Sequence, residues 1–198
     1  INSLEDLQGL KMRIPGLGGE VFSRAGGVPV TMQVSDVFTS LETGALDATE
    51  WVSPYNDLAA GYHTVARYYY YPGWHEPGST LETIFNKEAF EALPEDLQEI
   101  LLAASEVMNK RIHDELTARN NEALQTLVNE HNVELRRIPD DVLQEFRRLS
   151  EEVILEMAAV DETSQRVYQS WKAFLDGVSA YHQIAEDAFI EARNLPLN

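Results

Sequence analysis

The sequence predicts an α/β fold with a mostly parallel sheet and long C-terminal helices. Over residues 1–86, short apolar runs rich in Val, Thr and Tyr alternate with short amphipathic segments, and Gly and Pro separate them. Strands that alternate with helices favour βαβ units, in which right-handed crossovers join parallel strands. From residue 87 onward, apolar residues recur at the helical spacing almost without interruption. We therefore expect an α/β lobe over residues 1–86 and a helical region over residues 87–198.

Turn residues set the bounds of the elements expected in the first region. Ser35 is expected to cap a helix that Gly44 ends, and Pro54 suits the first turn of the next helix. The expected helices cover residues 18–27, 35–44 and 54–66. The expected strands cover residues 9–16, 28–34, 45–52 and 67–73, with 80–86 as a candidate fifth strand.

The second region is predicted to contain two long helical stretches. Residues 94–132 carry an apolar stripe, and Pro94 suits their first helical position. The stripe consists of Leu97, Leu101, Ala104, Val107, Met108, Ile112 and Leu116. A short extended piece near 133–138 precedes a second helical stretch, from Asp140 to about Arg193, which Gly177 is expected to break. Helices of this length either cross to another lobe or pack on another chain.

The charge and the composition exclude several classes of function. The chain carries 33 acidic and 15 basic residues, a formal charge of −18, and its field would repel nucleic acid and anionic membranes. The densest basic stretches, 136–137 and 147–148, are interleaved with acids and read as solvated helix faces. Without cysteine, disulfides, thiolate zinc sites and cysteine nucleophiles are impossible. No run of about 18 apolar residues exists, so we expect no membrane insertion.

Polar residues at the ends of predicted strands are the candidates for a ligand site, because ligands of parallel α/β sheets gather at the carboxyl ends of the strands. Arg13 ends the first strand, and its planar guanidinium can hold a carboxylate through two hydrogen bonds. From the residues alone, an ordinary surface arginine or an internal ion pair is the more common explanation of Arg13, because single arginines are mostly structural. Glu50 ends the third strand beside Trp51. A buried glutamate must be ionised and paired, protonated, or bound to a cation, unless it simply reaches solvent.

The loop GWHEPG, residues 73–78, is the third candidate. It cannot form the zinc helix HExxH, because Pro77 and Gly78 forbid the helical spacing of that motif. Glu76 can serve with Glu50 as an oxygen ligand of a hard cation. His75 suits a hydrogen-bonding role in the loop better than metal ligation. The sequence has no nucleophile elbow and no phosphate-binding loop, so nucleophilic catalysis finds little support.

Two long segments resemble the extracytoplasmic solute receptors of TRAP transporters, the DctP type. These segments are GLKMRIPGLGGEVFSRAGGVPV (9–30) and LETGALDATEWVSPYNDLAAGYHTVARYYYYPGWHEPG (41–78). The resemblance is nearest to the branch that binds 2-oxo acids and related monocarboxylates. It extends over essentially the whole chain but corresponds to the C-terminal part of such receptors, so a missing N-terminal portion is expected to supply most of the first lobe.

The resemblance implies a role for each candidate residue. Arg13 matches the arginine that clamps the ligand carboxylate. Glu50, the carbonyl of Trp51, and Glu76 match the positions that hold a bridging cation, Na⁺ or Ca²⁺. Trp74 belongs to the same matched loop and is expected to contact the ligand. Residues 1–86 would then be a periplasmic-binding-protein-like lobe that binds a small organic acid.

The resemblance also implies a location and partners. The receptor would be periplasmic, would pass its ligand to the membrane subunits of the transporter for uptake driven by an ion gradient, and would not be an enzyme. The long helices would cross between lobes and could form a homodimer. Two alternatives stay open from the residues: a metal-dependent hydrolase or lyase that uses Glu50 and Glu76 as an acid/base pair, or a helical interaction module built on residues 94–193.

Overall fold

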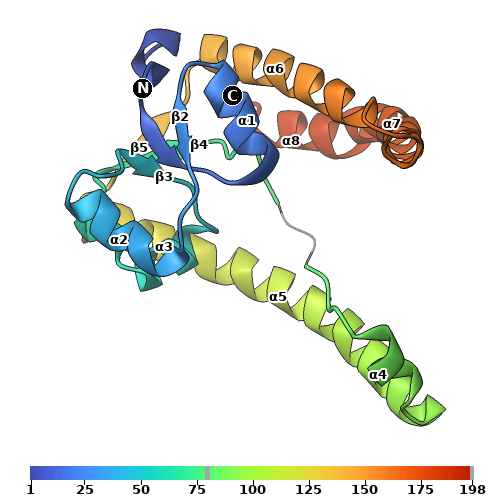
Figure 1. Ribbon diagram of the computed structural model, residues 1–198. Coiled ribbons are helices and arrows are strands. Elements are labelled where there is room, and N and C mark those ends of the chain that lie inside the picture. Colours follow the sequence, from blue (N-terminus) through green and yellow to red (C-terminus); the bar gives the residue numbers. More distant parts are fainter. Residues whose placement is uncertain (79–80, 197–198) are drawn as a thin grey trace. The chain divides into compact units, whose positions relative to one another are not determined.

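The structure, a computed structural model, describes residues 1–78 and 81–196, and its elements alternate between strand and helix before the long helices begin (Figure 1). In chain order the elements are a 3₁₀ helix η1 (Leu4–Leu7), β1 (Lys11–Arg13), α1 (Gly16–Arg24), β2 (Val28–Val30), α2 (Val34–Glu42), β3 (Ala48–Thr49), α3 (Pro54–Ala59), a 3₁₀ helix η2 (Tyr62–Thr64), β4 (Tyr68–Tyr71), α4 (Lys87–Glu91), α5 (Glu95–Asn129), β5 (Glu134–Arg137), α6 (Asp140–Ala158), α7 (Glu162–His182), a π-helical turn η3 (Gln183–Asp187) and α8 (Ala188–Arg193).

The strands form two small parallel sheets. In the first, β1 lies between β2 and β3, with Met12 opposite Pro29 on one side and Ala48 on the other. In the second, β4 pairs with β5, and Tyr69 lies opposite Leu135. The predicted α/β fold with parallel strands and long C-terminal helices is confirmed. Because β1 and β3 run in the same direction, the residues that follow them emerge at one edge of the sheet.

The candidate fifth strand at 80–86 was wrong for residues 81–86, which have no regular structure, while residue 80 lies outside the described residues. Strand β4 instead takes β5 as its partner, a segment that returns to the sheet only after the 35-residue helix α5. The extended piece expected near 133–138 is therefore a sheet strand. A β-prone sequence forms a strand only where a neighbour offers its backbone groups.

Several helix ends differ from the predicted ones. Helix α2 begins at Val34 after Gln33, and the hydroxyl of Ser35 donates to the Asp36 carboxylate instead of capping the helix. Gly44 follows the end of α2 with a φ of 75°, the left-handed conformation expected of a helix stop. Helix α3 begins at Pro54 as predicted but ends at Ala59, and Pro94 is the N-cap of α5 and not its first residue.

The break expected at Gly177 was also wrong, because that residue lies inside α7. Helices α6 and α7 are separated at residues 159–161 instead. There the side chain of Asp161 accepts a hydrogen bond of 2.7 Å from the backbone N–H of Ser164, an N-cap that starts the new helix. A single glycine costs a helix only about 1 kcal/mol, so it does not end one by itself.

The turn after β1 is held by a close approach of helix α1. A Cβ atom on Gly19 would lie 2.6 Å from the carbonyl oxygen of Ile14, so only glycine lets α1 pack this closely on the turn. Ile14 itself is almost fully buried. The position of Arg13, the residue before Ile14, is therefore fixed by the core on one side and by the β1 ladder on the other.

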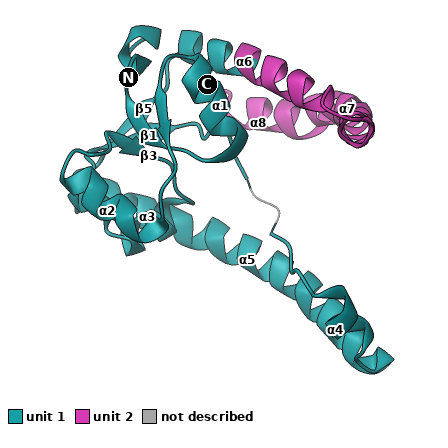
Figure 2. Cartoon of the chain, viewed as in Figure 1, with its two compact units in different colours: residues 1–147 teal, residues 148–198 magenta. Residues whose placement is uncertain are grey.

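The chain divides into two compact units, residues 1–147 and 148–198 (Figure 2). The first unit contains both sheets, and α3 packs against α5 within it. Strand β5, which lies beyond residue 87, pairs with β4, so one sheet contains strands from both expected regions, 1–86 and 87–198. The division into these two regions stays a prediction. Within residues 1–78 and 81–196, none of the helices has the length and apolar character needed to cross a membrane.

Candidate functional site

The edge of the first sheet brings two of the predicted site residues together. Strand β1 ends at Arg13, and β3 ends at Thr49, directly before Glu50. The backbone N–H of Glu50 donates to the carbonyl oxygen of Arg13 at 3.2 Å, which extends the ladder by one residue. Both side chains therefore leave the sheet at the same place, as the argument from strand ends predicted.

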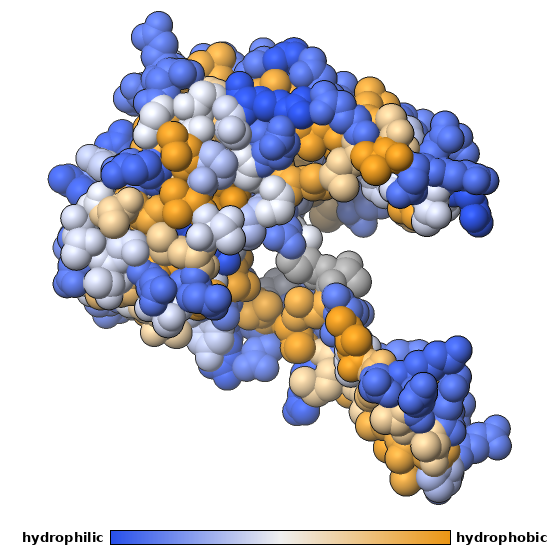
Figure 3. Space-filling model, viewed as in Figure 1, coloured by the Kyte–Doolittle hydropathy of each residue, from blue (hydrophilic) through white to orange (hydrophobic). Residues whose placement is uncertain are grey.

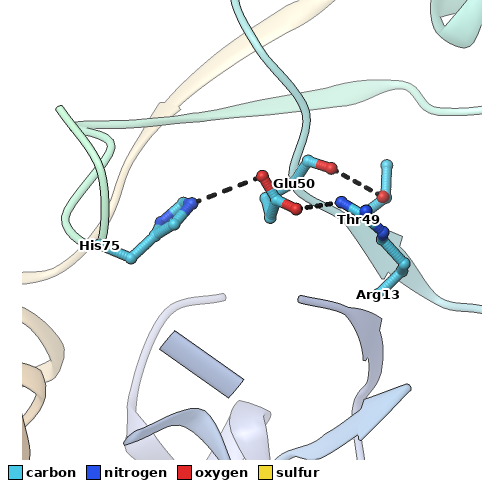
Figure 4. Close-up of polar contacts among 4 residues, drawn as sticks. All are labelled: Arg13, Thr49, Glu50 and His75. Carbon is cyan, nitrogen blue, oxygen red and sulfur yellow. Dashed lines mark hydrogen bonds and ion pairs between the residues drawn. The ribbon is translucent and has the colours of Figure 1, made fainter. Parts of the chain in front are cut away.

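Arg13 and Glu50 form an ion pair in which Nη1 donates to Oε1 (Figure 4). Their side chains are only 14% and 12% exposed, so neither charge is well hydrated. The guanidinium also lies 5.7 Å from the centre of the Trp51 ring, within the range of a cation–π contact. The internal ion pair and the paired glutamate were among the alternatives left open by the sequence, and this structure contains both.

A pocket of about 250 Å³ opens beside this ion pair. It is lined by Arg13, Pro15, Glu50, Trp51, Val52 and Glu76. Three segments distant in sequence supply these residues: the end of β1, the loop after β3 and the GWHEPG loop. The structure thus brings together the four residues that were predicted to hold a carboxylate and a cation.

Trp51 connects the pocket to the hydrophobic core. Its ring packs against a cluster formed by Val37, Leu46 and Tyr62, and meets the Tyr62 ring edge-on at 6.0 Å. Such edge-to-face contacts stabilise a defined orientation of the two rings. The loop that carries Glu50 is therefore anchored by its neighbour, which limits how far the carboxylate can move.

The GWHEPG loop approaches Glu50 through His75 rather than through Trp74. His75 Nε2 lies 3.7 Å from Glu50 Oε2, so Glu50 lies between the imidazole and the guanidinium (Figure 4). The Trp74 ring stacks on Phe146 of α6, with ring centres 4.1 Å apart and planes inclined by 21°. Trp74 is not among the described residues that line the pocket, and its expected contact with a ligand stays a prediction. The sequence analysis gave His75 only a hydrogen-bonding role in the loop and did not predict its contact with Glu50. The signal for that contact was the position of His75 directly before Glu76, a predicted cation ligand.

The oxygen atoms available in the pocket fit a hard cation in part. Glu50 and Glu76 offer carboxylates and Trp51 a main-chain carbonyl, the ligand types that Na⁺ and Ca²⁺ accept. Elsewhere in the described chain, as here, no three His, Asp or Glu side chains are grouped so that they could hold a metal ion alone. A cation at this pocket would need further oxygens from water and from the ligand.

A buried acid on α3 was missed by the sequence analysis. Asp57 of α3 is 8% exposed and is the buried charged residue of the described chain. The Tyr69 hydroxyl of β4 donates to its Oδ2 at 2.5 Å. Burial raises the pKa of Asp57 to about 6; the Tyr69 hydrogen bond opposes this shift, and the charge of Glu50 adds to it. The segment PYNDLA has the pattern of an ordinary amphipathic first helical turn. The sequence therefore does not indicate that Asp57 is buried or that it pairs with Tyr69.

A profile of one protein family matches most of the chain. The bacterial extracellular solute-binding proteins, family 7 (DctP), match residues 1–161. The chain belongs to this family. Family 7 proteins bind solutes and are not enzymes, so the expectation of a non-enzymatic protein is confirmed and the hydrolase or lyase alternative is overturned.

Individual relatives of this family 7 chain are also solute-binding proteins. A monocarboxylate 2-oxoacid-binding periplasmic protein of Nostoc sp. is 39% identical over 94% of the chain and 51% of its own length. A TRAP periplasmic solute-binding protein of Pseudoalteromonas atlantica, solved with sodium and pyruvate, is 36% identical with a TM-score of 0.87 over 96% of the chain and 58% of its own.

A third relative adds a different cation and a second subunit. A TRAP transporter solute-binding protein of Bordetella bronchiseptica, solved as a mixed-occupancy dimer with calcium and picolinate, is 33% identical with a TM-score of 0.90. That match covers 98% of the family 7 chain and 57% of the relative. The chain therefore spans between half and three fifths of the length of the relatives that it matches.

Proposed function

We propose that the chain is part of a TRAP solute receptor that captures a small monocarboxylate, a 2-oxo acid such as pyruvate, through Arg13 and a bridging cation. The observation that carries this proposal is the pocket lined by one guanidinium and two carboxylates, in the segments that follow the carboxyl ends of parallel strands. The relatives named for 2-oxo acids and those solved with pyruvate or picolinate support the ligand class.

Charge balance explains why an acid and a cation bind together. Arg13 and Glu50 neutralise each other, so a ligand anion alone would add a negative charge to a poorly hydrated site in a chain of charge −18. If a cation arrives with the anion, Arg13 can pair with the ligand carboxylate while Glu50 pairs with the cation. Each charge keeps a partner throughout, and neither binding step leaves a buried charge alone.

Glu50, the Trp51 carbonyl and Glu76 would hold the cation, and Arg13 would hold the opposite side of the ligand carboxylate. A bound cation would supply the positive charge that a second carboxylate-binding arginine would otherwise provide. Two carboxylates and an anionic ligand favour Ca²⁺ over Na⁺ because divalent ions gain more from each charged oxygen. His75 would hold Glu50 in place from the side away from Arg13.

The family and its relatives also support a location and partners. The receptor would act in the periplasm and deliver its ligand to the membrane subunits of a TRAP transporter. It would form a homodimer through the C-terminal helices, because one face of α7 exposes large apolar side chains, Val167, Trp171 and Phe174 among them. The dimeric structure of the Bordetella bronchiseptica relative supports this assembly.

Calorimetric titration of the complete gene product that contains these residues tests the proposal. After chelation, pyruvate and 2-oxobutyrate should bind only when Na⁺ or Ca²⁺ is restored, and the ligand should be recovered unchanged. Consumption of the ligand, or equal affinity with and without a cation, would overturn it. Glu50→Gln should lose cation and ligand affinity together, whereas Glu42→Gln, the same change at an exposed position, should behave as the wild type.

A further inference from the structure

Helix α3 takes its N-terminal hydrogen bond from a helix that comes much later in the chain. The backbone N–H of Tyr55, the second residue of α3, donates to the side-chain oxygen Oδ1 of Asn120 in α5 at 3.0 Å. Ser53 precedes the helix and is a residue type that favours capping, but its hydroxyl donates to the Asn56 side chain at 2.8 Å instead. The first N–H groups of a helix have no partner within it, so the contact with Asn120 ties the start of α3 to α5.

A second contact from α5 holds the same residue. The guanidinium of Arg119, the neighbour of Asn120, lies 5.2 Å from the centre of the Tyr55 ring, within the range of a cation–π contact. Helix α3 also packs against α5 (Figure 1). Consecutive residues of α5 therefore hold both the backbone and the ring of Tyr55.

The short segment between this anchor and the first sheet carries the main-chain oxygen that we assign to the cation. At the other end of the segment, the N–H of Glu50 donates to a carbonyl of β1 at 3.2 Å. Pro54 has a fixed φ and restricts the residue before it, and Ser53 is accordingly extended, with φ −170° and ψ 166°. Val52 is 60% exposed, so packing contributes little to holding it. The direction of the Trp51 carbonyl therefore depends on where the two ends of the segment are held.

We propose that Asn120 is a positioning residue of the cation site: its side-chain oxygen fixes the start of α3 and thereby the direction of the Trp51 carbonyl. The inference rests on the proposed function, since it concerns the same cation. Groups behind a metal ligand keep it in orientation, and their loss typically weakens metal affinity about 10–100-fold. A carbonyl that is already held in place binds the cation without the entropic cost of first ordering the segment.

Asn120→Ala in the complete gene product is the direct test. The change removes the acceptor, and the Ca²⁺ concentration that half-restores pyruvate binding should rise about 10-fold, the low end of that range. Pyruvate affinity at saturating Ca²⁺ should return to the wild-type value, because Arg13 is unaffected. Asn121→Ala makes the same change at the next, exposed position of α5 and should leave the Ca²⁺ midpoint unchanged. Alanine favours the helix similarly at both positions, so the comparison isolates the hydrogen bond.

Two variants of similar shape decide the test if Asn120→Ala does not fold. Asn120→Leu keeps a branched side chain but has no acceptor, so it should raise the Ca²⁺ midpoint as alanine does. Asn120→Asp keeps an oxygen that can accept from the Tyr55 N–H, and a carboxylate is favourable at a helix N-terminus, so it should keep the wild-type midpoint. A thermal melt of each variant without ligand measures stability separately. A residue that served stability alone would change the melting temperature and not the Ca²⁺ midpoint.

Either of two results would overturn the inference. The first is a wild-type Ca²⁺ midpoint in folded Asn120→Ala or Asn120→Leu protein. The second is an Asn120→Asp protein whose midpoint rises as much as that of the leucine variant, because the acceptor would then not be the cause. Both results leave the proposed function intact as long as the wild type binds pyruvate only with a cation. If the wild type itself shows no cation-dependent binding, the proposed function fails and the inference falls with it.

Discussion

Arg13 and Glu50 show at the scale of single residues how a site can be prepared for two ligands of opposite charge. Each of these poorly exposed groups would be costly alone, and each offsets the other's lost hydration. Exchange of partners is then nearly neutral, since an anion replaces Glu50 at Arg13 while a cation replaces Arg13 at Glu50. The ion pair is therefore consistent with a binding site and does not argue against one.

Arg13→Ala should weaken pyruvate binding by about 2–5 kcal/mol, because it removes one half of a poorly hydrated charge pair and leaves the ligand carboxylate without its cationic partner. Calorimetry at saturating Ca²⁺ measures the effect. Arg24→Ala removes an exposed arginine whose partner, Glu20, lies one helical turn away, and should leave affinity unchanged. An Arg13→Ala protein that binds pyruvate as the wild type does would show that the guanidinium does not hold the ligand.

The pKa of Asp57 predicts how the free energy of unfolding depends on pH. Its folded pKa, about 6, is above the ordinary value of 3.8, so between these values the folded chain binds more protons than the unfolded chain. The stability contributed by the protonated acid is complete below about pH 3.8 and is lost as the pH rises through 6. Asp57→Asn avoids this loss, so its stability relative to the wild type should improve by about 2–3 kcal/mol from pH 4 to pH 7.5.

Urea denaturation of both proteins across this pH range measures that difference. Tyr69→Phe provides a check on the cause, because the Tyr69 hydrogen bond lowers the pKa of Asp57. Without it, the loss of stability should extend to higher pH. A difference between wild type and Asp57→Asn that stays constant from pH 4 to pH 7.5 would mean that the Asp57 carboxyl does not titrate in this range.

The sequence predicted where residues gather better than it predicted what they touch. The rule for strand ends placed Arg13 and Glu50 at one pocket, because β1 and β3 are parallel neighbours in one sheet. Glu76 lines the same pocket from the loop after β4, a strand of the second sheet.

The sequence showed no sign of the buried Asp57, whose hydrogen-bond partner, Tyr69, is 12 positions away on β4. The ligand contact of Trp74 was implied by the resemblance and stays a prediction. The stacking of its ring on Phe146 joins residues 72 positions apart, and no motif reveals it.

At the scale of elements, local sequence signals predicted most helices and strands correctly. They did not predict strands whose formation depends on a pairing partner. The alternation over residues 1–71 correctly predicted parallel strands and their order along the chain. Residues 81–86 have strand-like composition but no neighbour to pair with, and residues 134–137 became a strand because β4 was available. The same limit applies to Gly177, since α7 continues through a residue that intrinsic propensity alone disfavours.

Gly177→Ala should therefore stabilise the protein by about 0.5–1 kcal/mol, because alanine restricts the unfolded chain and favours the helix. A Cβ atom at this position meets no other atom within 4 Å. Gly44→Ala is the matched control: a Cβ there also has open space, but the φ of 75° is strained for alanine, and the change should destabilise by about 1–2 kcal/mol. Urea midpoints measure both, and equal shifts of one sign would contradict the argument.

At the scale of the whole molecule, a large amount of apolar surface is left uncovered. The apolar stripe predicted along α5 is largely exposed, Val107 at 62% and Met108 at 46%, and apolar side chains lie open along this helix (Figure 3). Phe174 of α7 is 71% exposed. Monomeric proteins seldom expose extended apolar faces without a partner. The charge of −18 opposes any association between copies, so the apolar contact must outweigh that repulsion.

If the homodimer forms through α7, its strength should depend on both terms. Phe174→Glu puts a charge into the apolar face and should shift the protein toward monomer, by at least 10-fold in the dissociation constant, because an unpaired charge would have to be buried. Gln169→Glu adds the same charge two residues from Val167 and Trp171, about 200° around the helix from each, and should change the dissociation constant far less.

Sedimentation equilibrium at several salt concentrations measures the dissociation constants of both variants and of the wild type. The wild-type dimer should tighten from low to physiological salt, as screening reduces the repulsion between two acidic chains. A dimer that is insensitive to Phe174→Glu and weakens with salt would be held by polar contacts elsewhere on the chain.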